Sequence, residues 1–185
     1  MKNALILHGT NANSRVHWFP WLKRELEKRG WKVWVPDLPR ADRPNIKRYT
    51  DFLFANMDWK FDAESVLIGH SSGAVAILGL LQHLPDDVVV DTCILVGVFK
   101  DDLGWESLTD LFEEPFDFAE IKKHARRFLF IHSDNDPFCP LSHARLLARK
   151  VDGKLLIRRG EGHFFEKDGR DYTELPYLLE LLSSD

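Results

Sequence analysis

Five consecutive residues, Gly69-His70-Ser71-Ser72-Gly73, match the pattern G-x-S-x-G around a serine nucleophile. This pattern occurs where a strand turns sharply into a helix, because a strained turn exposes the hydroxyl and glycines leave room for neighbouring chain. The motif lies between an apolar run, Ser65–Ile68, and the most apolar helical segment, Ser72–Leu84. This setting predicts that Ser71 is a nucleophile beside a helix N-terminus. A Gly/Ser-rich helix cap without chemistry is the alternative.

A serine hydroxyl needs a base to take its proton and an acid to orient that base. The expected chain order is serine, acid and histidine, each on a loop after a strand. Gly160-Glu161-Gly162-His163-Phe164 follows the last apolar run, so His163 is the predicted base. The acid comes from Ser133-Asp134-Asn135-Asp136-Pro137. Asp136 is preferred to Asp134 because a residue before proline is held extended.

The chain contains eight histidines, so the choice of base depends on position. His163 stands out because it lies in a glycine-flanked turn directly after the last predicted strand. The alternatives at strand ends are His8, His70 and His132, whereas His17, His83, His124 and His143 resemble ordinary helix residues.

Two backbone amides are expected to bind the oxyanion of an acyl-transfer intermediate. One is the amide of Ser72, directly after the nucleophile. The second comes from the loop after the first apolar run, His8-Gly9-Thr10-Asn11, where Thr10 is preferred and Asn11 is the alternative. The sequence leaves the choice between them open.

The segment Phe99–Phe118 is irregular and rich in aromatic residues, and it follows the fourth predicted strand. It is a candidate for a short cap or pocket wall. The predicted substrate pocket consists of Asn11, Trp18, Trp105 and Phe112. Packing in the core is the alternative for each of these aromatic side chains.

Six short apolar runs predict strands, and their nearly continuous apolar character indicates that helices cover both faces. They are Ala4–His8, Lys32–Val35, Ser65–Ile68, Thr92–Val96, Phe128–Ser133 and Lys154–Ile157. Helical patterns occur at His17–Arg29, Asn45–Ala55, Ser72–Leu84, Leu141–Val151 and Glu174–Leu182. This alternation predicts right-handed βαβ units. We expect one domain, 1–185, with an α/β-hydrolase core of about six mostly parallel strands, helices on both faces and no large lid.

The composition narrows the class of protein. Among the 185 residues, 44% are hydrophobic, which favours a packed globule. The net charge of −4 disfavours nucleic-acid and acidic-membrane partners. No run approaches the ~20 apolar residues of a membrane helix, and no secretory signal is visible, so we expect a cytoplasmic protein. The two cysteines, Cys93 and Cys139, lack zinc-site spacing, and no metal or other cofactor is predicted.

Several motifs, distributed nearly end to end, resemble the retinoblastoma-binding protein 9 and YdeN-like family of small serine hydrolases. They are Leu7-His8-Gly9, His17-Trp18-Phe19-Pro20-Trp21-Leu22-Lys23, Pro36-Asp37-Leu38-Pro39, Gly69-His70-Ser71-Ser72-Gly73-Ala74, Asp134-Asn135-Asp136-Pro137-Phe138 and Gly162-His163-Phe164. The resemblance implies a nearly lidless core with Ser71, Asp136 and His163 as the triad. It does not carry over the retinoblastoma partner, since neither cysteine lies in an L-x-C-x-E segment.

The sequence therefore predicts a carboxylesterase-like serine hydrolase that acts on small-molecule esters, with amides as a second class, through an acyl-enzyme. The alternative is a weak or inactive hydrolase scaffold that binds a ligand or protein. A nucleotide-binding protein is disfavoured because G-x-G-x-x-G and the phosphate-loop pattern are absent.

Overall fold

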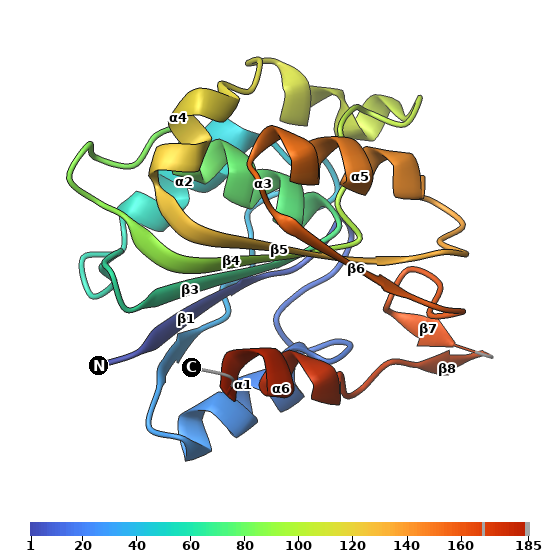
Figure 1. The fold of residues 1–185 in the computed structure, drawn as a ribbon, viewed down its shortest axis with the longest axis horizontal. Coiled ribbons are helices and arrows are strands. Elements are labelled where there is room, and N and C mark those ends of the chain that lie inside the picture. Colours follow the sequence, from blue (N-terminus) through green and yellow to red (C-terminus); the bar gives the residue numbers. More distant parts are fainter. Residues whose placement is uncertain (168, 184–185) are drawn as a thin grey trace.

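A six-stranded parallel sheet, in the order β2-β1-β3-β4-β5-β6, forms the centre of the computed structural model (Figure 1). The structure describes residues 1–167 and 169–183, so residues 168 and 184–185 of the predicted domain lie outside it. The strands are β1 (Asn3–Leu7), β2 (Lys32–Trp34), β3 (Ser65–His70), β4 (Val90–Val96), β5 (Ala125–Ser133) and β6 (Lys154–Arg158). All six predicted strands are confirmed, with small shifts at their ends.

Helices cover both faces of this sheet (Figure 1). One face carries α1 (Phe19–Lys28) and α6 (Pro176–Ser183). The other carries α2 (Ile46–Phe54), α3 (Ser72–Leu81), α4 (Phe118–Lys123) and α5 (Leu141–Lys150). Because side chains alternate along a strand, Leu5 and Leu7 of β1 join the core cluster of one face, while Ala4 and Ile6 join that of the other.

Helix α3, which belongs to the most apolar helical segment of the sequence, lies at the centre of the larger layer (Figure 1). All ten of its residues are buried. A helix that is apolar nearly all round is stable only where neighbours surround it. The serine at its N-terminus is therefore attached to one of the most enclosed elements of the molecule.

Three short features were not predicted from the sequence, namely a 3-10 helix, helix α4 and a two-stranded hairpin. The segment Phe99–Phe118, predicted to be irregular, contains the 3-10 helix η1 (Glu106–Phe112) and the first residue of α4. After β6, the strands β7 (Glu166–Lys167) and β8 (Arg170–Asp171) form an antiparallel hairpin. Elements this short leave almost no periodic pattern in the sequence. The described residues form no lid over the sheet edge, and none of their helices is long and apolar enough to cross a membrane.

Candidate active site

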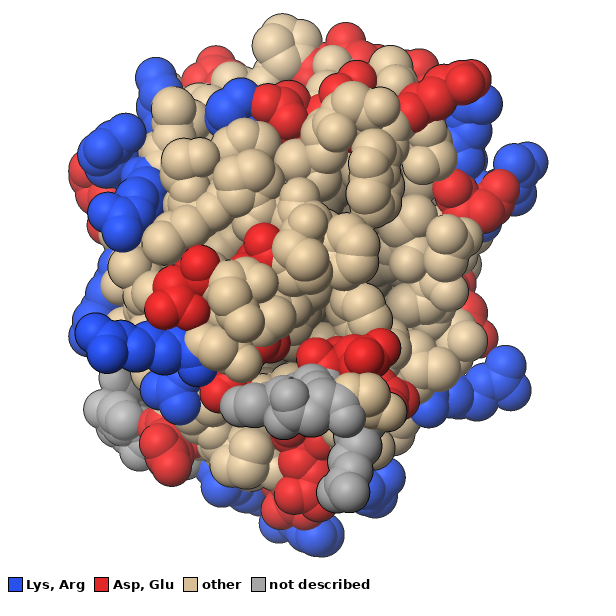
Figure 2. Space-filling model, turned by 90° about the vertical axis from the view of Figure 1, so that its right-hand side faces the viewer, with Lys and Arg blue, Asp and Glu red and all other residues tan. Residues whose placement is uncertain are grey.

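A cavity of about 320 Å³ opens at the carboxyl end of the sheet. Figure 2 views this side of the molecule, where the tan centre is hollowed, acidic side chains border it and basic side chains lie mainly towards the margins. The polar part of the lining includes Thr10, Asn11, His17, His70, Ser71 and His163. The apolar part includes Phe99, Leu103, Trp105, Leu108, Phe138 and Phe165. The cavity therefore brings Ser71 and His163 together from separate loops.

Ser71 occupies the sharp turn between β3 and α3. Its backbone has φ 55° and ψ −123°, a region that a residue with a side chain adopts only under strain. The Ser71 amide donates a hydrogen bond to the Val96 carbonyl at 2.8 Å, which fixes the turn against the end of β4. These values match the strained strand-to-helix turn predicted from the motif.

The two glycines of the motif are required by close contacts between backbone segments. A Cβ on Gly69 would lie 2.6 Å from the Ala74 backbone. A Cβ on Gly73 would lie 2.4 Å from the Leu7 carbonyl oxygen and 2.5 Å from that of His8. Because none of these atoms belongs to a flexible side chain, any larger residue would displace β1 or α3.

His163 and Asp136 form a hydrogen-bonded pair beside this turn. Nδ1 of His163 lies 2.7 Å from Oδ2 of Asp136, and the two side chains are only 7% and 1% exposed. The other carboxylate oxygen of Asp136 accepts hydrogen bonds from the amides of Phe138 and Cys139, both at 2.9 Å. Since a carboxylate only accepts, Nδ1 of His163 carries the proton and Nε2 is left to exchange one.

Three side chains before Asp136 attach its loop to the loop of His163. Asp134, Ser133 and Asn135 accept hydrogen bonds from the consecutive amides of residues 160, 161 and 162, at 2.9, 3.0 and 2.8 Å. Asp134, the second candidate for the acid, therefore connects the two loops and does not bond to His163. The polar run Ser-Asp-Asn at the end of a predicted strand was the signal for these contacts.

The alternative bases at strand ends are engaged elsewhere. Both ring nitrogens of His8 form hydrogen bonds, to the Gly9 carbonyl and the Leu38 amide, each at 2.9 Å. Nε2 of His132 donates to the Cys139 carbonyl at 2.8 Å, and Nε2 of His70 donates to the His163 carbonyl at 2.7 Å. Burial lowers the pKa of all three, that of His70 most strongly. Burial therefore favours the neutral form of these three rings, and their hydrogen bonds connect loops.

The loop after β1 lies beside the start of α3, because the Thr10 hydroxyl donates to the Ser72 hydroxyl at 2.9 Å. The Asn11 amide donates to the Ala41 carbonyl at 3.0 Å and is therefore occupied. Neither the Thr10 amide nor the Ser72 amide has a hydrogen-bond acceptor within the described part of the chain. Of the two predicted alternatives, Thr10 is the one whose amide remains available for an oxyanion.

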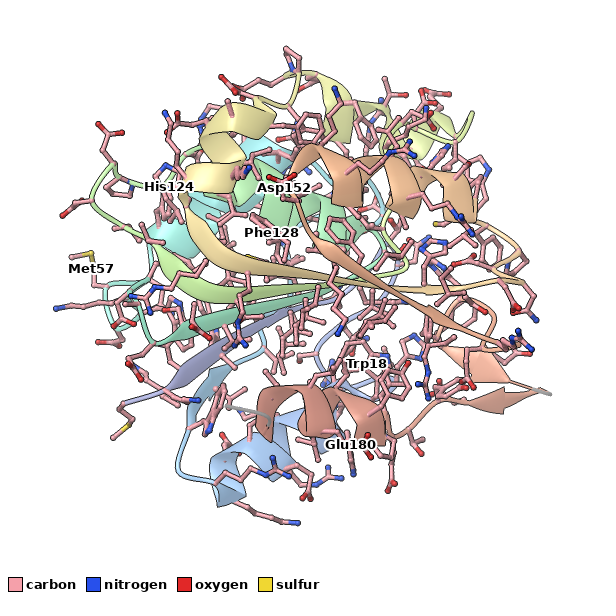
Figure 3. The ribbon with its side chains drawn as sticks, viewed as in Figure 1. Trp18, Met57, His124, Phe128, Asp152 and Glu180 are labelled. Atoms are coloured by element: carbon pink, nitrogen blue, oxygen red, sulfur yellow. The ribbon has the colours of Figure 1, made fainter. Side chains whose placement is uncertain are left out.

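Two of the four predicted pocket residues line the cavity, namely Asn11 and Trp105. Trp18 does not, because it is fully buried between the sheet and the α1/α6 layer, where its indole donates to the Phe164 carbonyl at 3.0 Å (Figure 3). Phe112 also lies outside the lining and packs on Phe99 and Phe116, with ring centroids 6.0 Å apart in each pair. Sequence spacing identified the right segments and could not give the direction of each ring.

The prediction that His17 is an ordinary helix residue is wrong. It lies before α1 with φ 56°, lines the cavity and is bonded through Nδ1 to Oδ1 of Asp171 at 2.6 Å. Phe138 and Phe165 are further lining residues that sequence reasoning missed. For Phe165, its position two residues after His163 in the chain could have indicated that it lines the cavity.

Three potential metal ligands, Asp136, Cys139 and His163, have ligand atoms within 4.8 Å of one another. Two of them are the hydrogen-bonded pair already described. Burial raises the pKa of the Cys139 thiol well above its ordinary value, which disfavours the thiolate that binds metals. The donor set therefore fits an acid–base pair beside a neutral thiol better than a metal site.

The parallel sheet, the strained serine turn and the His163–Asp136 pair define an α/β-hydrolase. The family model described as serine hydrolase matches residues 4–184, and the chain belongs to this family. It is 32% identical to the YdeN protein of Bacillus subtilis (strain 168) over 184 residues, which cover 99% of this chain and 95% of that one. It is 28% identical to the serine hydrolase RBBP9 of Rattus norvegicus over 171 residues, 90% of this chain and 85% of that one.

Solved structures show the same fold. The crystal structure of the B. subtilis ydeN gene product has a TM-score of 0.91 at 31% identity, with 100% of this chain and 98% of that chain covered. Est1E from Butyrivibrio proteoclasticus has a TM-score of 0.70 at 15% identity, with 99% and 89% covered, which shows the fold alone. The family resemblance inferred from the motifs is thus confirmed.

Proposed function

We propose that this protein hydrolyses small carboxylic esters, with amides as a second substrate class, through an acyl-enzyme on Ser71. The observation that carries the proposal is a single cavity lined by a serine in a strained turn and by a buried histidine bonded to a carboxylate. Membership of the serine hydrolase family supports the same chemistry. Its partners would be small molecules, because the hollow is too small for a polymer segment to be enclosed.

In the first half of the reaction, Nε2 of His163 accepts the Ser71 proton as the serine oxygen attacks the substrate carbonyl. The amides of Ser72 and Thr10 donate to the resulting oxyanion. The protonated His163 then gives its proton to the leaving alcohol or amine, and the acyl-enzyme remains. In the second half, His163 takes a proton from water as the water oxygen attacks the acyl group. The bond between the acyl group and the Ser71 oxygen then breaks, His163 returns the proton to that oxygen, and the acid is released. Asp136 holds the imidazole and stabilises its charged form.

The apolar wall of the cavity supports short or aromatic acyl groups as substrates. Trp105 and Phe138 contact each other with ring centroids 6.0 Å apart, and Phe138 contacts the His163 ring at 5.4 Å. An acyl group on Ser71 would therefore contact aromatic surface next to the base. A volume of about 320 Å³ lies at the lower end of the range for ligand pockets, so long lipid chains fit poorly.

The decisive experiment combines a fluorophosphonate probe with p-nitrophenyl acetate hydrolysis. Wild-type protein should be labelled at Ser71, and Ser71→Ala should lower kcat by about 10⁶-fold without unfolding the protein. Ser142→Ala is the matched control, since Ser142 is an exposed serine of α5 and should keep both labelling and rate. Wild-type rates in Ser71→Ala, or a folded wild type that the probe does not label, would contradict the proposal and favour a binding scaffold.

A further inference from the structure

His17, which lines the cavity, forms a second histidine–carboxylate pair outside the proposed triad. Nδ1 of His17 lies 2.6 Å from Oδ1 of Asp171, and the side chains are 20% and 50% exposed. His17 has φ 56°, so a strained backbone places this residue at the cavity. Nε2, the other ring nitrogen, has no hydrogen-bond partner among the described residues.

This second pair lies close to the proposed base. The Phe165 ring contacts the rings of both His163 and His17, with ring centroids 5.8 Å and 5.6 Å apart. The segment that follows His163 carries both Phe165 and Asp171, and it folds back on itself where the Tyr172 amide donates to the Phe165 carbonyl at 2.8 Å. One segment therefore supplies the base and the carboxylate that holds His17.

The hydrogen bond to Asp171 decides what His17 offers to a bound molecule. Because a carboxylate accepts and does not donate, the proton lies on Nδ1, and in the neutral imidazole Nε2 is then an acceptor. The described residues that line the cavity include no Lys or Arg, and acidic side chains border it (Figure 2). This charge pattern disfavours a substrate carboxylate and suits a hydroxyl or ammonium group.

We propose that His17, held by Asp171, is a substrate-positioning residue whose Nε2 accepts a hydrogen bond from a hydroxyl or ammonium group of the ester. This inference rests on the proposed function and narrows its substrate class. The preferred ester carries a hydrogen-bond donor that reaches His17 while the ester carbonyl lies at Ser71, since both residues line one cavity. The rest of the substrate lies against the apolar wall around Trp105 and Phe138.

The test compares the hydrolysis of esters of equal length that end in a methyl, hydroxyl, ammonium or carboxylate group. One series carries this end group in the acyl part of the ester, and a second series carries it in the alcohol part. Wild-type kcat/KM should favour hydroxyl or ammonium over methyl by about 3- to 10-fold in at least one series, the size of one neutral hydrogen bond. The carboxylate ester should be the poorest. The hydroxyl and ammonium arms distinguish a neutral donor from a cationic one.

His17→Asn is the informative variant. An asparagine amide can still donate to Asp171 in place of Nδ1, and asparagine tolerates positive φ, but no atom replaces the Nε2 acceptor. The preference over the methyl ester should disappear in His17→Asn. It should persist in His83→Asn, because His83 bonds to Glu114 at 3.0 Å in a similar pair outside the cavity.

A purely structural role for His17 would change the rates for all esters alike and leave their ratios as in the wild type, which would overturn the inference. A wild-type preference for the carboxylate ester in both series would also overturn it. The experiment distinguishes a failure of the proposed function from a failure of the inference about His17. If hydrolysis of the methyl ester does not depend on Ser71, the proposed function is wrong and the inference with it, whereas Ser71-dependent hydrolysis with unchanged ratios removes the inference alone.

Discussion

The turn that carries Ser71 and the loops that carry Asp136 and His163 face the same cavity but are held by different interactions. Around Ser71 the backbone is held by contacts between main-chain atoms, with Gly73 against β1 and every residue of α3 buried. The opposing loops are held by polar side chains, since residues 133–135 accept hydrogen bonds from residues 160–162. The position of the nucleophile thus depends on close packing, which leaves no space for a side chain at Gly73. The position of the acid–base pair depends on specific hydrogen bonds between the two loops.

This contrast has a consequence for mutation. Larger residues in place of Gly69 or Gly73 at the serine turn should first reduce folding stability, because the closely packed backbone around these glycines cannot relax. Substitutions in the opposing loops should reduce catalysis while leaving the core intact. The His70 side chain connects the two regions, since its Nε2 donates a hydrogen bond to the His163 carbonyl.

Among substitutions in the opposing loops, Asp136→Asn should have the largest effect. Oδ1 of asparagine can keep the hydrogen bonds from the Phe138 and Cys139 amides, so the loop should stay folded. Its amide group would then face Nδ1 of His163 and favour the wrong imidazole tautomer, which lowers kcat by about 10⁴-fold. Ester hydrolysis and thermal unfolding of the same samples measure both effects.

Asp134→Asn is the matched control for this variant, because asparagine can still accept the hydrogen bond from the Gly160 amide. It should retain most of the activity. A rate for Asp136→Asn above one tenth of the wild-type rate would show that the carboxylate does not orient the base.

Gly73→Ala should give the opposite result at the serine turn. Its Cβ would overlap the Leu7 and His8 carbonyl oxygens, so we expect a loss of unfolding free energy of about 3 kcal/mol, the upper range for overpacking. Gly30→Ala is the control, since no atom lies within 4 Å of its Cβ and only the φ of +80° opposes it, at a cost of about 1 kcal/mol. Urea unfolding compares them, and equal losses would contradict the role given to close packing.

The smallest expected effect concerns His70, the connection between the two regions. Burial holds the pKa of His70 well below its ordinary value of about 6.5, so the native state stays neutral where the unfolded chain binds a proton. The free energy of unfolding should therefore fall as the pH decreases from 7 to 5.5, by up to about 1.4 kcal/mol per pH unit from this group. His8 and His132, whose pKa values burial also lowers, act in the same direction.

Urea unfolding at several pH values tests this dependence. His70→Gln should be less stable at pH 7 but show a shallower decline with acid, because glutamine can donate to the His163 carbonyl and does not titrate. His83→Gln, at a partly exposed position, should keep the wild-type slope. A slope in His70→Gln equal to that of the wild type would show that His70 does not bind the proton on unfolding.

The elements that carry the site were predictable because they obey local rules. Apolar runs such as Ser65–Ile68 have no stable setting except a covered sheet, and the serine turn needs glycines at two positions. The hairpin β7–β8 and the helix η1 were missed, since two to seven residues give no reliable period. Among the histidines, His17 was misjudged because its neighbours in the sequence resemble a helix start, while its contacts come from Asp171 far along the chain.

The sequence by itself determined the sheet, the central helix and the loops on which a nucleophile, an acid and a base would lie, because periodicity and glycine placement act over a few residues. Only the tertiary structure decided which side chains of those loops meet. It brought Asp136 and not Asp134 to His163, turned Trp18 into the core and placed His17 at the cavity. Side-chain direction depends on packing against residues that are distant in the chain, and no local pattern encodes that packing.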